Sequence, residues 1–296
     1  MLQIPIFFVY LCILISKLKN ESYLICMKKV NKVLYISQEI FPYLPESEIA
    51  NMGRYLPQAV QDRGRETRTF MPKFGAINER RNQLHEVIRL SGMNLIIDDT
   101  DHPLIIKVAS IQAARLQVYF IDNEDFFHRK NTISDESGEE YSDNDERTIF
   151  FVRGVMETVK KLRWTPDVIH CLGWMTALAP LYIKKAFNQD PSFKNSKVVY
   201  SLFNDDFKQP FRGLFADKLI LEGIEPKDVE QLRKNEIDYV ALSKLAIDYS
   251  DGVIQSVPET NPEILEYIRE TNKKFLPYKE DEDYADDYVR FYDSVS

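Results

Sequence analysis

Short apolar runs bounded by turn residues recur along most of the chain, and this pattern predicts buried β-strands. Six such runs lie at residues 32–37, 67–72, 117–122, 167–170, 197–202 and 252–257. Between several of them, apolar residues recur at spacings of three and four, which is typical of a helix with one buried face. Alternating strands and helices favour βαβ crossovers. We therefore predict an α/β fold, with a Rossmann-like, doubly wound parallel sheet covered by helices on both faces.

The segment at residues 86–110 interrupts this alternation. Residues 87–90 and 93–97 are rich in apolar side chains and flank Ser91 and Gly92, a pattern that predicts a β-hairpin with its turn at that pair. Residues 104–108 are predicted to form a further strand. The segment is therefore expected to be an antiparallel insertion in the parallel sheet.

The two ends of the chain differ from its body. Residues 1–16 are uncharged and apolar, but they are shorter than the ~20 residues that span a bilayer and lack a preceding basic region. Because Met27 begins a block that leads directly into the first predicted strand, we expect translation to start there. Residues 1–26 would then be an apolar leader from a mis-assigned start, with a weak membrane anchor as the alternative. Residues 279–296 form an acidic, aromatic tail that is expected to dock as a short helix.

Composition excludes several classes of function. The 296 residues carry a net charge of −8, which gives no electrostatic basis for nucleic-acid binding. Three cysteines without CxxC spacing and four histidines without HExxH predict neither a disulfide framework nor a zinc site, so a cytoplasmic protein is expected. Neither a glycine-rich phosphate loop nor a GxSxG elbow occurs, and no cofactor is expected. Asp143-Asn144-Asp145 and Asp205-Asp206 are weak metal candidates in acidic surroundings, so no metal site is predicted.

Several segments, taken together, are more specific than any single motif. They are residues 32–42 (KVLYISQEIFP), 56–57 (LP), 118–123 (VYFIDN), 141–147 (YSDNDER), 166–170 (PDVIH) with 174–178 (WMTAL), 237–239 (IDY) and 256–258 (SVP). In this order they resemble the N-terminal, Rossmann-like lobe of bacterial starch and glycogen synthases, the retaining ADP-glucose transferases of glycosyltransferase family 5. The resemblance implies that residues 27–278 form one lobe, the N-terminal half of a two-lobed GT-B fold.

The chain departs from the family's pattern where the resemblance places the sugar nucleotide. The family's Lys-Thr-Gly-Gly-Leu loop, which approaches the donor's diphosphate and glucose, is replaced by Pro45, Glu46, Ser47, Glu48 and Ile49. Two carboxylates therefore replace a cation and flexible glycines. Like charges about 4 Å apart repel by ~1 kcal/mol in water and by ~4 kcal/mol at an effective dielectric of 20. The loop is thus expected to disfavour a diphosphate.

Two further positions that contact the sugar in the family are also changed. Gly173 stands in place of an aspartate, and Phe203 in place of a histidine. His170, Trp174 and Asn204 are retained and are the candidate binding residues. Each also has a structural interpretation: a buried, hydrogen-bonded histidine, a core indole, and a turn or helix-cap asparagine.

These departures predict a protein of glycogen metabolism that is not catalytic alone. Only some forty residues follow the SVP segment, so the family's second, nucleotide-binding lobe is expected to be absent from this chain. Losing one preorganised electrostatic group typically costs roughly 10²–10³ in rate. We expect a homologue without catalytic residues of its own that binds an α-glucan or a protein of glycogen metabolism. The alternatives are the active half of a split synthase whose nucleotide-binding lobe is a separate polypeptide, and an unrelated carbohydrate-binding module with stacking surfaces at Phe203 and Trp174.

Overall fold

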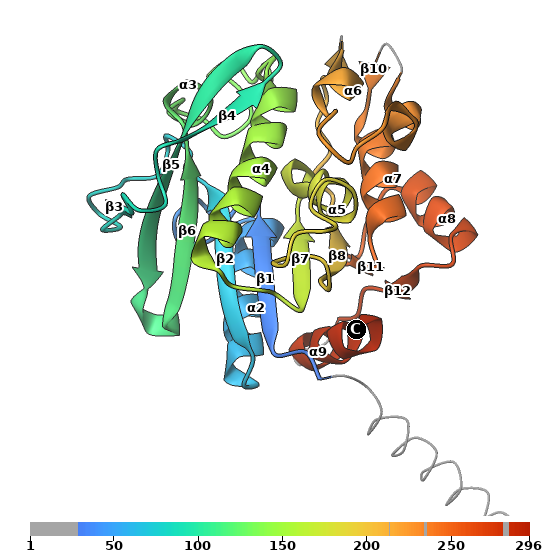
Figure 1. Cartoon of the computed structure of the whole chain (residues 1–296). Coiled ribbons are helices and arrows are strands. Elements are labelled where there is room, and N and C mark those ends of the chain that lie inside the picture. The colour runs from blue at the N-terminus through green and yellow to red at the C-terminus, as the bar shows by residue number, and fades with distance from the viewer. Residues whose placement is uncertain (1–28, 213, 234–235, 281–283) are drawn as a thin grey trace, which may run out of the picture.

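The computed structural model describes residues 29–212, 214–233, 236–280 and 284–296, and its centre is a twisted sheet with helices on both faces (Figure 1). The predicted leader at residues 1–26 lies outside the described residues. No helix in the described ranges has both the length and the apolar character needed to cross a bilayer.

The sheet is mainly parallel. Its strand order is β12-β11-β8-β7-β1-β2-β6-β5-β3, and β4 pairs with β5 beside this path. The chain builds one half through β1, β2 and β6 and the other through β7, β8, β11 and β12, so the winding reverses between β1 and β7. The predicted doubly wound α/β fold is confirmed. The strands are β1 (Lys32–Ser37), β2 (Glu66–Pro72), β3 (His85–Glu86), β4 (Met93–Ile97), β5 (Thr100–Ile111), β6 (Leu116–Asp122), β7 (Val168–Leu172), β8 (Lys197–Leu202), β9 (Phe211–Arg212), β10 (Glu236–Ile237), β11 (Gly252–Gln255) and β12 (Lys274–Leu276).

The antiparallel insertion is present, but its turn was predicted at the wrong residues. The hairpin joins β4 to β5, with Ile97 paired to Thr100 across Asp98 and Asp99. Asp98 has a φ of 51°, in the left-handed region that aspartate tolerates better than most side chains. The predicted strand at residues 87–90 does not form, and Ile88 is 83% exposed. Leu90 is nevertheless buried in the larger core and Val87 packs against it, because residues 87–90 bury these side chains from a turn and not from a strand.

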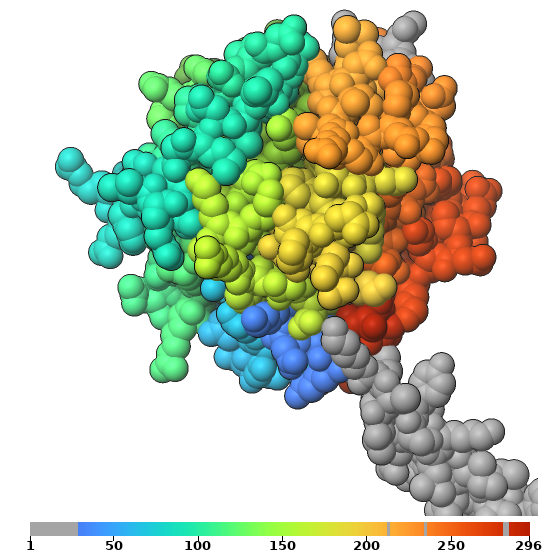
Figure 2. Space-filling model, in the orientation of Figure 1, coloured from blue at the N-terminus to red at the C-terminus, as the bar shows by residue number. Residues whose placement is uncertain are grey.

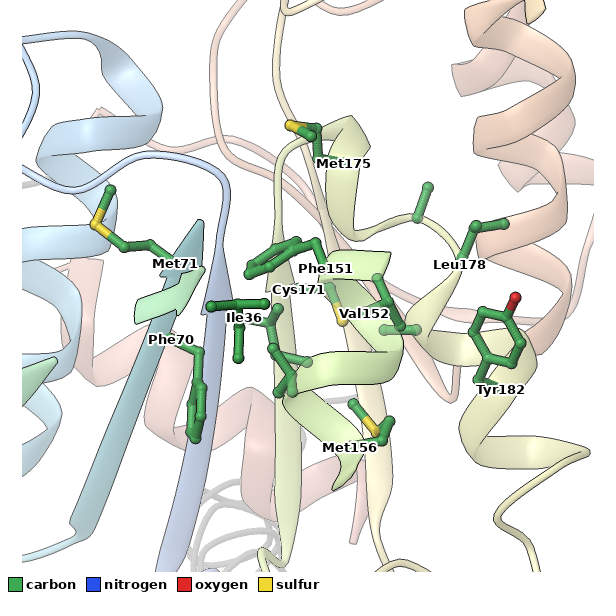
Figure 3. Packing of buried hydrophobic residues seen from close by; sticks show 14 of the residues in the cluster. Ile36, Phe70, Met71, Phe151, Val152, Met156, Cys171, Met175, Leu178 and Tyr182 are labelled. Carbon is green, nitrogen blue, oxygen red and sulfur yellow. The ribbon is translucent and has the colours of Figure 1, made fainter. Parts of the chain in front are cut away.

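Helices cover both faces of the sheet because alternate side chains of each strand point to opposite sides. Leu34 and Ile36 of β1 face the larger core under α4, α5 and α7, whereas Val33 and Tyr35 face a second core under α2 and α9. Figure 3 shows Ile36 and Cys171 packed against Phe151 and other core residues. The helices are α2 (Glu48–Asp62), α3 (Glu124–Phe127), α4 (Asn144–Leu162), α5 (Ala179–Lys184), α6 (Phe215–Lys218), α7 (Tyr239–Tyr249), α8 (Pro262–Glu270) and α9 (Tyr284–Val295), with 3-10 turns η1 (Gln112–Ala114), η2 (Trp174–Thr176) and η3 (Pro226–Leu232).

The C-terminal helix α9 is an integral part of the second core. Tyr288, Phe291 and Tyr292 are buried against the sheet. Asp293 accepts a hydrogen bond from the Val30 backbone N–H at 2.7 Å, which ties the helix to the start of β1. The prediction that the aromatic tail docks as a short helix is confirmed.

On the face shown in Figure 2, the yellow-green and yellow segments around α4 and α5 lie between the β4–β5 hairpin and the red C-terminal region.

Candidate functional site

The candidate site lies at the carboxyl edge of the sheet, beside the point where the winding reverses. Doubly wound sheets bind ligands in the crevice outside the carboxyl ends of the strands, at the point where the strand order reverses. The loops after β1, β7 and β8 lie at this edge, and the Gln38 backbone N–H donates to Leu172 O at 3.0 Å. The predicted site positions at residues 45–48, 170–174 and 203–204 belong to these three segments.

The loop after β1 ends at the N-terminus of α2, which carries acidic side chains. Ser47 is the N-cap: its Oγ accepts from the Ala50 N–H at 3.0 Å and donates to Glu39 Oε2 at 2.6 Å. Glu46 and Glu48 are exposed on either side of this cap. A helix N-terminus carries a partial positive charge that attracts anions. Here the carboxylates of Glu46 and Glu48 flank it.

Gly173 occupies a position where no larger residue fits without rearrangement. Its φ is +88°, and a Cβ atom there would lie 2.9 Å from Gln38 Cβ, 3.0 Å from Gln38 Oε1 and 3.3 Å from Ile49 Cδ1. The Gln38 side chain is held in this place, because its Oε1 accepts from the Met175 N–H at 3.1 Å. The side chains of Gln38 and Ile49 therefore fill the space that a residue-173 side chain would need.

Asp205, in the loop after β8, forms hydrogen bonds with Trp174 in the loop after β7 and with Tyr239 on α7. The sequence did not predict these contacts. Asp205 Oδ2 accepts from the Trp174 backbone N–H at 2.9 Å, and its Oδ1 accepts from Tyr239 Oη at 3.0 Å. Tyr239 Oη also lies 3.1 Å from the Phe203 carbonyl oxygen. Burial raises the pKa of Asp205 to about 6, and the neighbouring Asp206 charge adds to this, although the two donated hydrogen bonds oppose it. No spacing in the sequence links Asp205 to Tyr239.

His170 is enclosed within the second core instead of facing the sheet edge. Its Nε2 lies 2.6 Å from Ser201 Oγ, and its Nδ1 lies 2.7 Å from Tyr292 Oη on α9. Tyr35 Oη continues this chain of hydrogen bonds at 3.3 Å from Tyr292 Oη. Burial lowers the pKa of His170 to about 3, so the imidazole is neutral at pH 7. These contacts agree with the structural interpretation of this histidine.

The alternative of a carbohydrate-binding module with sugar-stacking surfaces at Trp174 and Phe203 is wrong, because both side chains are buried. Their exposed fractions are 1% and 2%. Phe207 and Phe211 cover the Trp174 ring at centroid distances of 5.0 and 5.9 Å. Phe203 lies in the second core, on the side of α2 and α9. Of the three retained candidate residues, only Asn204 is exposed.

In the weak metal candidate at residues 143–145, both aspartates are engaged in ion pairs. Arg129 donates to Asp143 at 2.6 Å, and Lys218 contacts Asp145 at 3.0 Å. Over residues 29–212, 214–233, 236–280 and 284–296, no group of three or more His, Cys, Asp or Glu side chains is placed to hold a metal ion.

Known proteins share both the sequence pattern and the architecture. The family model for the starch synthase catalytic domain matches residues 32–276. A glycogen synthase of Chlorobaculum parvum is 36% identical over 228 residues, covering 77% of this chain and 46% of the relative. A glycogen synthase of Chlorobaculum tepidum is 37% identical over 213 residues, with coverages of 71% and 43%. The chain thus spans about half the length of the curated relatives it matches.

A solved structure of low sequence identity to this chain has the same fold. The catalytic domain of starch synthase IV from Arabidopsis thaliana, bound to ADP and acarbose, superposes with a TM-score of 0.65 at 17% identity. The match covers 84% of this chain and 51% of that one. The two proteins therefore share the fold of this region.

Proposed function

Because the chain belongs to the starch synthase catalytic-domain family, we propose that it acts in glycogen metabolism by binding an α-glucan or a partner protein, without transferring glucose by itself. In this proposal residues 27–278 form the family's N-terminal lobe, and the acidic aromatic tail closes the second core. Neither His170 nor Trp174 is open to a ligand at the sheet edge. Asn204 is the candidate polar contact there.

The single observation that carries this proposal is the filled space at Gly173. Gln38 and Ile49 lie within 3.3 Å of the position that a Cβ atom would take at residue 173, and Gln38 is fixed by its hydrogen bond from the Met175 N–H. A carboxylate that contacts the sugar, which the family resemblance implies at this position, has no room here. The acidic N-terminus of α2 also weakens binding of a sugar nucleotide, since Glu46 and Glu48 repel its diphosphate.

A transfer assay tests the proposal. The full chain, and in parallel the protein beginning at Met27, are incubated with ADP-glucose and glycogen, with an active glycogen synthase as the positive control. We expect no glucose incorporation, no heat of binding with ADP-glucose, and co-sedimentation of the chain with glycogen or with a captured partner. Glucose incorporation by the purified chain alone would contradict the proposal.

A second candidate is the active half of a split synthase. It is supported by the family match, because residues 32–276 match the starch synthase catalytic domain. In this case a separate nucleotide-binding lobe would supply the groups that hold the donor. Adding that lobe to the same assay should then produce transfer that neither polypeptide gives alone.

A further inference from the structure

A groove of about 630 Å³ lies between α2, α9 and the ends of β11 and β12. Asn51, Met52 and Tyr55 line it from α2, at the three- and four-residue spacings that place side chains on one helix face. The opposite wall comes from the segment after β12 and the first turns of α9. The volume lies within the roughly 300–1,000 Å³ that is typical of small-molecule sites.

Four tyrosine rings line this groove. Tyr55 and Tyr278 are 48% and 37% exposed, although both are large and largely apolar. Tyr284 and Tyr288 lie deeper and meet edge to face, with centroids 5.8 Å apart and an interplanar angle of 80°. Exposed ring surface in a concave site favours a ligand that can cover it.

The charges of the groove restrict the chemistry of that ligand. Among the described residues that line it, Lys279 is the one basic side chain, and its ammonium group is bound to Asp287 at 2.8 Å. Glu48 and Glu280 add further carboxylates. A phosphate or nucleotide would meet net negative charge here. A neutral sugar can pack the C–H face of its ring against tyrosine and donate its hydroxyl protons to the carboxylates.

We infer that this groove binds a neutral, phosphate-free oligosaccharide, and that it is the α-glucan site of the protein. The identification of the sugar as an α-glucan rests on the proposed function, whereas the location rests on the tyrosines and the charge. The site is separate from Trp174 and Phe203, whose rings are buried. Glucan binding at the groove requires neither a nucleotide nor a catalytic group.

The test uses the full chain and maltoheptaose, with titration calorimetry and ligand-observed NMR. Tyr55→Ala and Tyr278→Ala should each weaken binding roughly three- to tenfold, because each removes a ring that the sugar covers. Tyr278→Phe keeps the ring and should retain most of the affinity. Phe275→Ala removes a ring that is 36% exposed outside the groove, and it should leave the affinity unchanged. Glucose 1-phosphate should bind more weakly than glucose.

The outcomes separate this inference from the proposed function. Maltoheptaose affinity that persists in both tyrosine variants but is lost in Asn204→Ala would overturn the groove assignment and leave a glucan-binding protein. An equal loss in Phe275→Ala would also overturn it, because the effect would then not be local. If the wild-type chain binds no maltoheptaose, both the groove assignment and the glucan arm of the proposed function fail. All variants are checked for an unchanged circular dichroism spectrum and melting temperature.

Discussion

At the scale of single residues, Gly173 and Gln38 show how neighbouring side chains restrict a glycine position. A glycine in place of the aspartate that the family resemblance implies could leave an empty pocket. Here the Gln38 side chain occupies that space and accepts the Met175 N–H. An aspartate at residue 173 would therefore have to displace the Gln38 side chain.

Gly173→Asp is predicted to destabilise the fold by roughly 2–4 kcal/mol, from a left-handed backbone without glycine and from overpacking against Gln38. Urea unfolding measures the change. Gly64→Asp is the matched control, because Gly64 also has a positive φ, of 79°, but nothing lies within 4 Å of its Cβ position. A loss equal to that of the control would show that the space at residue 173 is not filled.

The carboxylates at the start of α2 give a second prediction at this scale. Changing both Glu46 and Glu48 to glycine should not lower any residual affinity for ADP, and should raise it where binding is measurable, because two like charges are removed. Calorimetry at low salt is the measurement. Glu46→Gln with Glu48→Gln separates charge from backbone flexibility. Weaker ADP binding in both double variants would show that these carboxylates do not repel the nucleotide.

At the scale of elements, α9 stabilises the second core through apolar packing and through a series of hydrogen bonds that begins at Tyr292. Tyr292 Oη reaches both His170 and Tyr35, and Asp293 holds the start of β1. Because α9 lies on the face that α2 only partly covers, its side chains complete the enclosure of His170.

Tyr292→Phe should cost about 1–3 kcal/mol, because it leaves His170 Nδ1 buried without its partner while the packing of the ring is kept. Chemical unfolding measures the loss. Tyr284→Phe is the comparison, since Tyr284 lies on the same helix but is only partly buried, and it should change stability little. Equal effects of the two substitutions would argue against a specific role for the His170 contact.

At the scale of the whole molecule, two buried groups act on stability with opposite signs as pH changes. The pKa of His170 falls from 6.5 to about 3 on folding, so its contribution is complete above pH 6.5 and is lost as pH falls toward 3. The pKa of Asp205 rises from 3.8 to about 6, so its contribution is complete below pH 3.8 and is lost as pH rises toward 6. The two effects partly cancel in weakly acidic solution.

We therefore expect Asp205→Asn to steepen the rise of unfolding free energy between pH 4 and 6, and His170→Gln to flatten it. Urea unfolding at half-unit pH steps compares each variant with the wild type. Parallel profiles for all three proteins would contradict both assignments. If only one variant changes the slope of unfolding free energy against pH, the other residue does not contribute to the pH dependence of stability.

The sequence alone determined the fold class, the positions of the main parallel strands and the docking helix at the C-terminus. These features follow from local apolar periodicity, which reports which side chains must be buried. The same reasoning misplaced the β4–β5 turn, because the apolar side chains of Val87 and Leu90 pack against the core from a turn, and apolar content alone does not distinguish this from a strand.

For the candidate site, the sequence predicted replaced positions but not the contacts that surround them. The replacement of an aspartate at residue 173 stays a prediction, and no sequence signal indicated that Gln38, 135 residues earlier, fills the space beside it. Likewise, the Asp205–Tyr239 bond, the covering of Trp174 by Phe207 and Phe211, and the tyrosine groove join segments far apart in the chain. Periodicity is a local property and reveals burial, but the partner of a buried group is chosen only when the strands and helices pack.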